Sequence, residues 1–473
     1  MAKLFGTSGA RGKTNLEITP MLAFCIALCY GLNLKSAKGG KRVRVLVGHD
    51  QRFGADMLAN SVIAGFQAVG VDVVMLGMVP TGVYCVYMRE GNFDGGILVT
   101  GSHMRPERIG IIPMLGNGHY ADRDVTDPIE IRLATIDVLL EEEHTRGRYL
   151  VGHEHIGGMT SENGLPRYAD SVCRAFGRDW IAIKGAGFRV ILDPGNGTAG
   201  EISQHLLGVL RLTHTVLNSD PKPIPDRRSE CTPENCAEAI ARTRDGGFTL
   251  GACFDGDADR VKFITPEGVM LQDDVVAGIF ARHLLQADDV VVTPVNASGM
   301  IEEICRERVA LVKYCRIGQP ATDTAVRTHK AVFAFEANAG KYGFREFECC
   351  YDGVYAALKM LAIMAKTGKS LAELAADLPR CYQAAVRIEV PDARKEAVVA
   401  VATESLRASL VEEIVWTDTT DGTKWFMKSG AWLLLRPSGT EPVVRAYSDA
   451  RTQERADELV RMAREEFERA LTA

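Results

Sequence analysis

The chain alternates short apolar runs with stretches in which apolar residues recur every three or four positions. An apolar run at 43–48 precedes such a stretch at 56–70, and further apolar runs follow at 71–77 and 95–101. Short apolar runs bounded by turn residues predict buried strands, and the three-to-four spacing predicts amphipathic helices. The strand, helix, strand order therefore predicts a βαβ arrangement with parallel strands.

The same order recurs twice more along the chain. It is found in FRVILDPGNGTAGEISQHLLGVL with THTVLN (188–218), and again between DVVVTPVNAS and LVKYCRIG (289–318). After residue 380, AAVRIEV, VEEIVWTD, WFMKSG and AWLLLRPSG indicate strands, and a helix closes the chain at 454–471. This pattern predicts an α/β protein of three mixed α/β domains with similar βαβ architecture, plus a smaller C-terminal α+β domain.

The length of the chain also favours several domains, because 473 residues are too many for one ordinary core. An acidic run followed by glycines marks a first boundary near residue 150. We expect four domains, at residues 1–150, 151–267, 268–379 and 380–473.

Composition narrows the function classes. The formal net charge of −6 and the lack of a basic block argue against nucleic-acid binding. No stretch approaches the roughly 18 uninterrupted apolar residues of a membrane span, and the start MAKLFGTSG has no export signal, so we expect a cytoplasmic protein. The 12 cysteines form no CxxC pair, which argues against a zinc site. Cys25 and Cys29 are expected to be buried thiols on one apolar helix face.

Three aspartates alternate in the segment CFDGDADRVKF, at Asp255, Asp257 and Asp259. In an extended loop alternate side chains point the same way, so three carboxylates can converge on one hard cation, and this pattern favours Mg²⁺. An EF-hand is excluded, because Arg260 replaces its glycine and Pro266 its last glutamate. A solvated loop is the alternative, but three acids at the end of a buried strand repel one another without a counter-ion.

Two other turns carry reactive or anion-binding side chains. The apolar run 97–99 leads into TGSHMRPERIG, which holds Ser102 between a glycine and a histidine. In LRPSGTEPVVRAYSD, Arg436 can fork onto two phosphate oxygens, and the following residues offer the donors of an anion nest. Those nest residues are Ser438, Gly439 and Thr440. An ordinary Ser-Gly turn is the plainer interpretation.

Two further turns are less specific. Glu336 follows the apolar strand AVFAF, where a carboxylate suits sugar hydroxyls, although a helix cap has the same pattern. Near the N-terminus, FGTSGARGK places Thr7, Ser8 and Arg11 in one glycine-rich turn.

The segment GNGTAG (195–200) keeps a different enzyme class open. It follows a predicted strand, opens a helix and has Asp220 about 20 residues on, as a dinucleotide-binding fingerprint does. Glycine-rich turns of this kind occur in any α/β module, however, and a dinucleotide-dependent oxidoreductase leaves the three aspartates unexplained.

These turns, in this chain order, resemble the α-D-phosphohexomutase superfamily, which includes phosphomannomutase/phosphoglucomutase and phosphoglucosamine mutase. The resemblance runs from FGTSGARG to the RPSGTEP loop and so spans nearly the whole chain. It implies that Ser102 carries a phosphoryl group, and that Mg²⁺ is held by the three aspartates and an oxygen of this phosphate. It also implies that Arg260 steadies the phosphate and that loops of all four domains surround one central cleft.

The same resemblance implies which residues bind the substrate. They are Thr7, Ser8, Arg260, Glu336, Asn338, Arg436, Ser438, Gly439 and Thr440. Asn338 belongs to EANAG, which is closer to the archaeal-type ExNGG than to the histidine-ending sugar loop of many members.

The chain departs from the family pattern at the general base. Members commonly have a lysine ten residues after the phosphoserine, where this chain has Ile112. Isoleucine cannot accept a proton, so either Lys341, Arg11 or His103 substitutes, or the substrate binds differently. We hypothesise that Lys341, next to the sugar loop, helps to replace the base, and that His103 has the plainer role of donating a hydrogen bond.

The resemblance implies a Mg²⁺-dependent isomerase that moves a phosphoryl group between the 1- and 6-positions of a hexose phosphate. A phosphoserine supplies the group, a sugar bisphosphate is the intermediate, and the enzyme is a monomer or homodimer without nucleic-acid or membrane partners. The alternatives are a phosphoglucosamine mutase or phosphopentomutase, a non-catalytic sugar-phosphate binder on the same scaffold, and the oxidoreductase.

Overall fold

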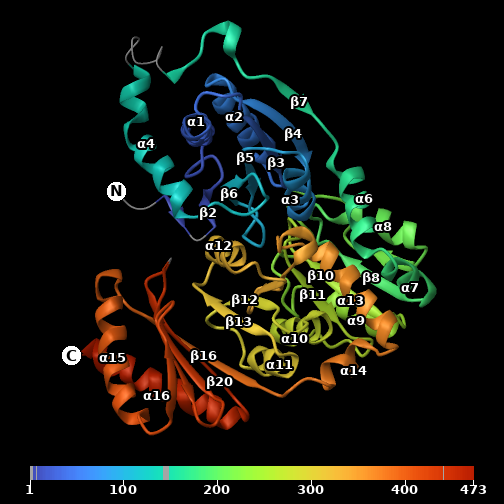
Figure 1. Ribbon diagram of the computed structural model, residues 1–473, viewed down its shortest axis with the longest axis vertical. Coiled ribbons are helices and arrows are strands. Elements are labelled where there is room, and N and C mark those ends of the chain that lie inside the picture. The colour runs from blue at the N-terminus through green and yellow to red at the C-terminus, as the bar shows by residue number, and fades with distance from the viewer. Residues whose placement is uncertain (1–3, 7, 142–148, 440, 473) are drawn as a thin grey trace. The chain divides into compact units, whose positions relative to one another are not determined.

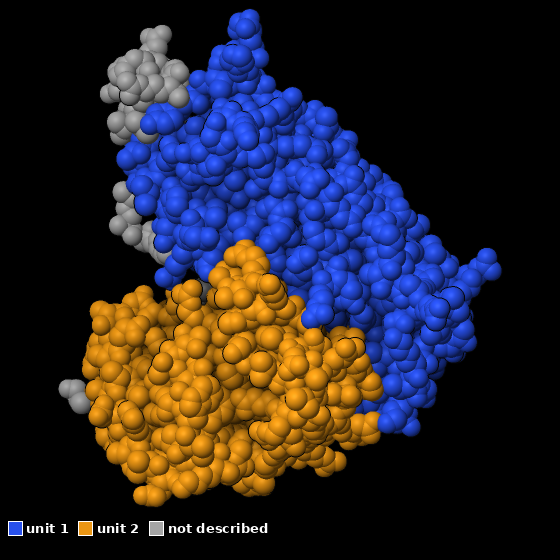
Figure 2. Space-filling view, in the orientation of Figure 1, with its two compact units in different colours: residues 1–272, 340–374 blue, residues 273–339, 375–473 orange. Residues whose placement is uncertain are grey.

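The computed structural model describes residues 4–6, 8–141, 149–439 and 441–472. The chain forms two compact units: unit 1 contains residues 1–272 and 340–374, and unit 2 contains residues 273–339 and 375–473 (Figure 2). The architecture expected from the sequence is confirmed, since three mixed α/β domains precede a domain built on an antiparallel sheet (Figure 1). The four domain boundaries stay a prediction.

The first sheet of unit 1 is mixed and has the strand order β1-β2-β6-β5-β3-β4-β7. Its strands are β1 (Phe5–Gly6), β2 (Gly9–Lys13), β3 (Arg44–His49), β4 (Asp72–Met78), β5 (Gly95–Thr100), β6 (Arg108–Leu115) and β7 (Met159–Ser161). Strands β4 and β5 lie parallel to β3 on either side, as the βαβ pattern predicts. Strand β7 joins this sheet although it lies beyond residue 150.

The helices of this domain are α1 (Pro20–Ala37), α2 (Ala55–Ala68), α3 (Thr81–Glu90) and α4 (Arg123–Glu141). Helix α1 begins where the Thr19 hydroxyl accepts a hydrogen bond from the Leu22 amide at 3.2 Å. Among the described residues it is the one helix long and apolar enough to cross a membrane. It packs against α2 and α4 inside the domain core, where Cys25 and Cys29 are buried as expected (Figure 1).

The second sheet of unit 1 has the order β11-β10-β8-β9, with β10, β8 and β9 parallel. Its strands are β8 (Arg189–Asp193), β9 (Thr213–Val216), β10 (Leu250–Phe254) and β11 (Val261–Ile264). The helices here are α6 (Gly164–Phe176), α7 (Asp179–Gly185), α8 (Gly200–Leu210), α9 (Ala237–Asp245) and α13 (Gly353–Thr367). Strand β15 (Lys341–Phe344) also belongs to unit 1, and α14 (Leu371–Ala376) contains the point where the chain passes to unit 2.

Unit 2 combines parallel strands with an antiparallel sheet of order β16-β20-β19-β18-β17. The parallel strands are β12 (Val290–Pro294), β13 (Leu311–Cys315) and β14 (Phe333–Glu336), accompanied by α10 (Asp273–Leu284), α11 (Met300–Arg308) and α12 (Gln319–His329). The antiparallel strands are β16 (Tyr382–Glu389), β17 (Ile414–Asp418), β18 (Thr423–Met427), β19 (Trp432–Pro437) and β20 (Val443–Ala450). Helices α15 (Lys395–Leu410) and α16 (Gln453–Thr472) pack against this sheet (Figure 1). An apolar cluster around Val295, Trp432 and Leu434 joins the two parts of unit 2.

Candidate active site

The ends of two strands in unit 1 bring a serine and three aspartates together. Ser102 follows β5 in a left-handed backbone conformation (φ 46°), and its Oγ donates a hydrogen bond to Asp255 Oδ2 at 2.6 Å. Asp255 follows β10 directly. Thr100 Oγ1 donates to Asp257 Oδ2 at 2.7 Å, which ties the aspartate loop to the end of β5. Segments more than 150 residues apart in the sequence thus form one polar cluster.

The three carboxylates form a group that fits a hard cation. One oxygen each of Asp255, Asp257 and Asp259 lies within 4.8 Å of the others, and each residue is only 1% exposed. Burial above all, and then the neighbouring carboxylates, raise the pKa of Asp255 well above its usual range and the pKa of Asp257 to about 6. Asp257 Oδ1 has no hydrogen-bond partner in the described part of the chain. A buried all-oxygen donor set with excess negative charge suits Mg²⁺.

Three basic side chains border this cluster. The Arg260 amide donates to Asp255 Oδ1 at 3.2 Å, and its guanidinium Nε lies 3.8 Å from Asp255 Oδ2. Arg11 Nε donates to the Ser8 carbonyl at 2.7 Å, and burial lowers the pKa of Arg11. Lys341 Nζ lies 2.7 Å from Asp259 Oδ2. Positive charge therefore borders the aspartate cluster.

Ile112 and Lys341 differ sharply in their surroundings. Ile112 lies within β6, pairs with Leu98 of β5 and is 1% exposed, so its side chain belongs to the core of the first domain. Lys341, at the start of β15, is also buried (4% exposed), but its ammonium group reaches the aspartate cluster. Lys341, from a different segment of the chain, thus reaches the aspartate cluster, whereas Ile112 is a buried apolar residue of β6.

His103 lies between the serine and a glutamate. Its Nδ1 is 3.4 Å from Ser102 Oγ, and its Nε2 is 4.0 Å from Glu230 Oε2. Burial and the positive charges of Arg260 and Arg11 lower the pKa of His103 to about 2, so the imidazole is neutral. Glu230 also lies 3.3 Å from Arg260 Nη1. Sequence analysis missed Glu230, because nothing in its segment PDRRSECTPEN marks it as a neighbour of Ser102.

Asp50 and Arg52 hold the serine loop, and sequence analysis missed both. Asp50 Oδ2 accepts a hydrogen bond from the Gly101 amide at 2.7 Å. The Arg52 side chain is 2% exposed, and its guanidinium donates to the Ser102 carbonyl at 2.6 Å. It also donates to the carbonyls of Met104, Arg105 and Arg108. The available signal was the polar string DQR directly after strand β3.

The glycine-rich turn GNGTAG supports the aspartate loop. The Thr198 amide donates to the Gly256 carbonyl at 2.9 Å, and the Asn196 amide to the Asn218 carbonyl at 2.8 Å. A Cβ at Gly197 would lie 2.5 Å from the Gly256 oxygen, so only glycine permits this approach. Because these amides already bind backbone oxygens, they are not available to a pyrophosphate, and the dinucleotide interpretation loses its main support.

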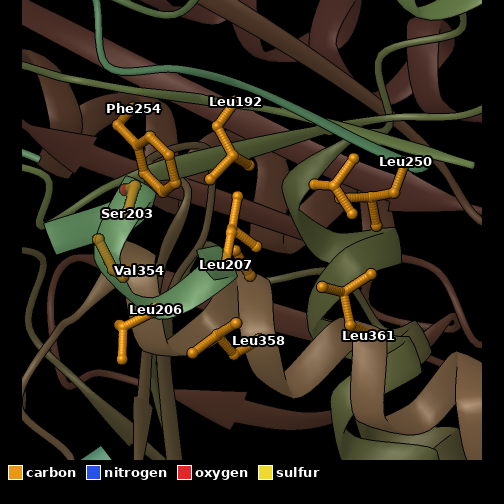
Figure 3. A pocket seen from close by; sticks show the side chains of 11 residues that line it. Leu192, Ser203, Leu206, Leu207, Leu250, Phe254, Val354, Leu358 and Leu361 are labelled. Atoms are coloured by element: carbon orange, nitrogen blue, oxygen red, sulfur yellow. The ribbon is translucent and has the colours of Figure 1, made fainter. Parts of the chain in front are cut away.

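An apolar cavity lies behind the same loop. It is lined by side chains of β8, β10, α8 and α13, including Leu192, Leu207, Leu250, Phe254 and Leu361 (Figure 3). Its volume of about 10 Å³ is about what one water molecule needs, and the Ser203 hydroxyl is the polar group of its lining. We interpret it as a packing gap and not as a ligand site.

Unit 2 contains the remaining expected residues. Glu336 ends β14 and is half-buried, whereas Asn338 is exposed in a left-handed conformation (φ 58°). Ser438 Oγ accepts a hydrogen bond from the Glu441 amide at 3.2 Å, and Gly439 is exposed. Thr7 and Thr440 lie outside the described residues.

Arginine is concentrated beside residues 436–441, which we call the phosphate loop after the role that the family resemblance implies. Arg436 is 8% exposed and lies directly opposite Arg445 across the β19–β20 pair. The Nε atoms of both arginines lack a hydrogen-bond partner in the described part of the chain. Like charges directly opposite on two strands are destabilising, so this pair favours a bound anion. Arg445 was missed in the sequence, because its position depends on the strand register.

Comparison with known proteins gives concordant matches over the whole chain. Four domain models of the phosphoglucomutase/phosphomannomutase family match: alpha/beta/alpha domain I at residues 2–139, domain II at 166–268, domain III at 272–382 and the C-terminal domain at 386–466. The chain is 31% identical over 475 residues to a phosphoglucomutase/phosphomannomutase of Thermococcus kodakarensis, with 100% of each chain covered. It is 32% identical over 470 residues to a probable phosphoglucosamine mutase of Methanopyrus kandleri, with 99% of this chain and 97% of the relative covered.

A solved structure shares the fold. The crystal structure of a phosphoglucomutase/phosphomannomutase family protein from Burkholderia thailandensis matches with a TM-score of 0.81 and 24% sequence identity. The match covers 99% of this chain and 97% of that one.

Proposed function

The chain belongs to the α-D-phosphohexomutase superfamily, whose members are isomerases, and we propose that it moves a phosphoryl group between the 1- and 6-positions of a hexose phosphate. The observation that carries this proposal is the hydrogen bond from Ser102 Oγ to Asp255 within a cluster of three buried carboxylates. A serine in this setting can accept and return a phosphoryl group while the surrounding charges stabilise the transferred oxygens.

In the proposed reaction, phosphorylated Ser102 is the donor. The bond between phosphorus and Ser102 Oγ breaks as a substrate hydroxyl oxygen bonds to phosphorus, and the hydroxyl proton passes through a base to the released Ser102 oxygen. The resulting sugar bisphosphate turns over and its other phosphate returns to Ser102, while the proton of the serine hydroxyl passes to the released sugar oxygen. Mg²⁺, held by Asp255, Asp257, Asp259 and an oxygen of the Ser102 phosphate, would neutralise charge on the transferred group.

The chain's own residues divide the remaining work. Arg52 fixes the serine loop through four carbonyl contacts, which keeps Oγ at the aspartate cluster. Arg260 and Arg11 supply positive charge close to the transferred group. We assign the base to Lys341, because its amine reaches the aspartate cluster while Ile112 is confined to the core. Neutral His103 is a hydrogen-bond donor to the phosphoserine.

The substrate-binding residues follow the same proposal. We assign contacts with the substrate to Thr7, Ser8 and Arg260. We assign the sugar hydroxyls to Glu336 and Asn338, and the non-reacting phosphate to Arg436, Ser438, Gly439 and Thr440. None of the 12 cysteines, all of which the structure describes, forms a disulfide bond, which suits a reducing, cytoplasmic setting. We expect a monomer or homodimer.

The decisive test is the intact mass of the purified protein before and after phosphatase treatment, followed by peptide mapping. A removable phosphate on Ser102 supports the covalent carrier. If Ser102 stays unmodified in the presence of Mg²⁺ and several sugar bisphosphates, the mutase proposal fails.

The identity of the sugar needs a second experiment. Turnover of glucose, mannose, glucosamine and pentose phosphates by the phosphorylated protein distinguishes a hexose mutase from a phosphoglucosamine mutase or a phosphopentomutase. Ile112 is the observation that favours the remaining candidate, a non-catalytic sugar-phosphate binder, because the usual base position has no proton acceptor. Binding without turnover of any of these sugars would establish that alternative.

A further inference from the structure

Asp421 connects the phosphate loop of unit 2 to the segment that precedes α12. It lies in the turn between β17 and β18, and its Oδ2 is 3.1 Å from Nη2 of Arg436. The same oxygen accepts a hydrogen bond from the Ile317 amide at 3.0 Å. One carboxylate oxygen therefore contacts both the arginine of the phosphate loop and the backbone of the adjacent parallel-sheet domain.

Asp421 is the counter-ion of one member of a pair of neighbouring arginines. Arg436 and Arg445 lie side by side on β19 and β20. Glu441 forms an ion pair with Arg445, and Asp421 forms the one with Arg436. Arg436 Nε has no hydrogen-bond partner in the described residues, so the guanidinium keeps a donor for an anion that takes the place of Asp421.

The backbone around Asp421 is held firmly. At Gly422 (φ 91°) an added Cβ would lie 2.2 Å from the Leu435 carbonyl oxygen and 2.6 Å from Arg436 Cβ. The turn is therefore pressed against the strand that carries Arg436. The Asp421 side chain is 17% exposed, so rotation of this side chain into solvent is the simplest way to release the arginine.

We propose that Asp421 is a resident counter-ion of Arg436 that the non-reacting phosphate of the substrate displaces, which releases the Ile317 amide at the same time. The inference rests on the proposed function, because it takes Arg436 as the phosphate ligand. A dianionic phosphate forks onto guanidinium better than a single carboxylate oxygen does, so the exchange favours phosphate over weaker anions. Release of the Ile317 amide also couples phosphate binding to the backbone of residues 316–319.

The variant Asp421→Asn distinguishes two roles of Asp421: a carboxylate that phosphate displaces from Arg436, and a carboxylate that only orients the Arg436 side chain. Calorimetric titration with inorganic phosphate is expected to show binding about tenfold tighter than in the unchanged protein, because the competing charge is gone. Unchanged or weaker binding would overturn the proposal, because the loss of a carboxylate that only orients Arg436 would not strengthen phosphate binding. Asp418→Asn is the matched control, because it removes one charge from the end of β17 beside this turn, where Asp418 accepts a hydrogen bond from the Thr420 amide.

Two further measurements separate this inference from the proposed function. Arg436→Gln must weaken phosphate binding; if it does not, Arg436 is not the phosphate ligand and the function proposal itself fails at this loop. Hydrogen exchange at Ile317 in the unchanged protein should become faster when phosphate saturates the site. If hydrogen exchange at the Ile317 amide does not change although phosphate binds normally, displacement of Asp421 is contradicted, but the proposed function is not.

Discussion

The serine loop of unit 1 and the phosphate loop of unit 2 are both strand-to-turn segments, and each is backed by a basic side chain. Arg52 donates to the Ser102 and Met104 carbonyls at 2.6 and 2.8 Å, and Lys395 donates to the Ser438 and Glu441 carbonyls at 2.7 and 3.1 Å. In both loops a basic side chain therefore fixes the backbone of the turn through its carbonyl groups.

The two loops differ in the charge that surrounds them. The serine loop faces three buried carboxylates, so a phosphoryl group there depends on a bound cation. The phosphate loop has two arginines and can bind an anion directly. We infer that the first loop stabilises charge that changes during transfer and the second recognises charge that stays constant. Substitutions in the first should lower kcat, and substitutions in the second should raise KM.

The largest effect is expected for Asp257→Asn. Loss of one carboxylate from the cluster should lower kcat about a thousandfold, because charge on the transferred phosphoryl group loses its stabilisation. Steady-state kinetics in Mg²⁺ measure this effect, and thermal unfolding with and without Mg²⁺ is the second readout. Without Mg²⁺ the variant should be more stable than the unchanged protein, because a buried repulsion is removed. A kcat within threefold of the unchanged enzyme would contradict the metal assignment.

The next effect concerns Lys341. Lys341→Met should lower kcat about a hundredfold if the amine accepts the substrate proton. Lys341→Arg separates two roles of the side chain, since arginine keeps the positive charge beside Asp259 but does not exchange protons at neutral pH. Low kcat in both variants supports a base. Recovery with arginine indicates a purely electrostatic role, and unchanged turnover in the methionine variant removes Lys341 from the mechanism.

On the other side of the comparison, Arg436→Lys should raise KM about tenfold and leave kcat within about twofold. Lysine keeps the charge but loses the fork that fits two phosphate oxygens. Kinetics over a wide range of sugar phosphate concentrations measure both constants. A fall in kcat with constant KM would show that the phosphate loop stabilises the transition state, and the distinction between the loops would then be wrong.

The sequence predicted the elements of the fold well because each has a local signature. The βαβ order and the strands after residue 380 are both readable within short windows. The membership of β7 in the first sheet was not readable, because the exposed segment Met159–Ser161 has no apolar pattern.

Site residues divide in the same way. Ser102 and the three aspartates stand at the ends of apolar runs, where a polar residue attracts attention. Glu230 and Asp421 were missed because their importance comes from partners that only the tertiary structure brings near. Arg445 was missed for a related reason: its place opposite Arg436 depends on the register between β19 and β20, which a pattern of alternating residues does not specify on its own.

The smallest expected effect concerns a buried charge outside both loops. Lys424 of β18 is fully buried, and its Nζ lies 4.1 to 4.7 Å from the ring centres of Trp432, Tyr314 and Phe426. Burial lowers the pKa of Lys424 to about 8, although Glu302 and other carboxylates act in the opposite direction. Between about pH 8 and 10 the unfolded chain therefore binds more protons than the folded chain, and stability rises with pH.

Lys424→Met should consequently raise the free energy of unfolding at pH 7 by about 1 kcal/mol, and this advantage should shrink toward pH 10. Urea unfolding of both proteins at the two pH values measures the difference. The aspartate cluster predicts the opposite slope: because the pKa of Asp257 is raised to about 6, the metal-free protein should lose stability relative to Asp257→Asn as the pH rises from about 4 to 6. A methionine variant that is less stable at pH 7 would mean that the aromatic contacts of the ammonium group outweigh its desolvation. The aromatic side chains of unit 2 would then stabilise a buried cation on their own, whereas the buried carboxylates of unit 1 need a bound metal ion.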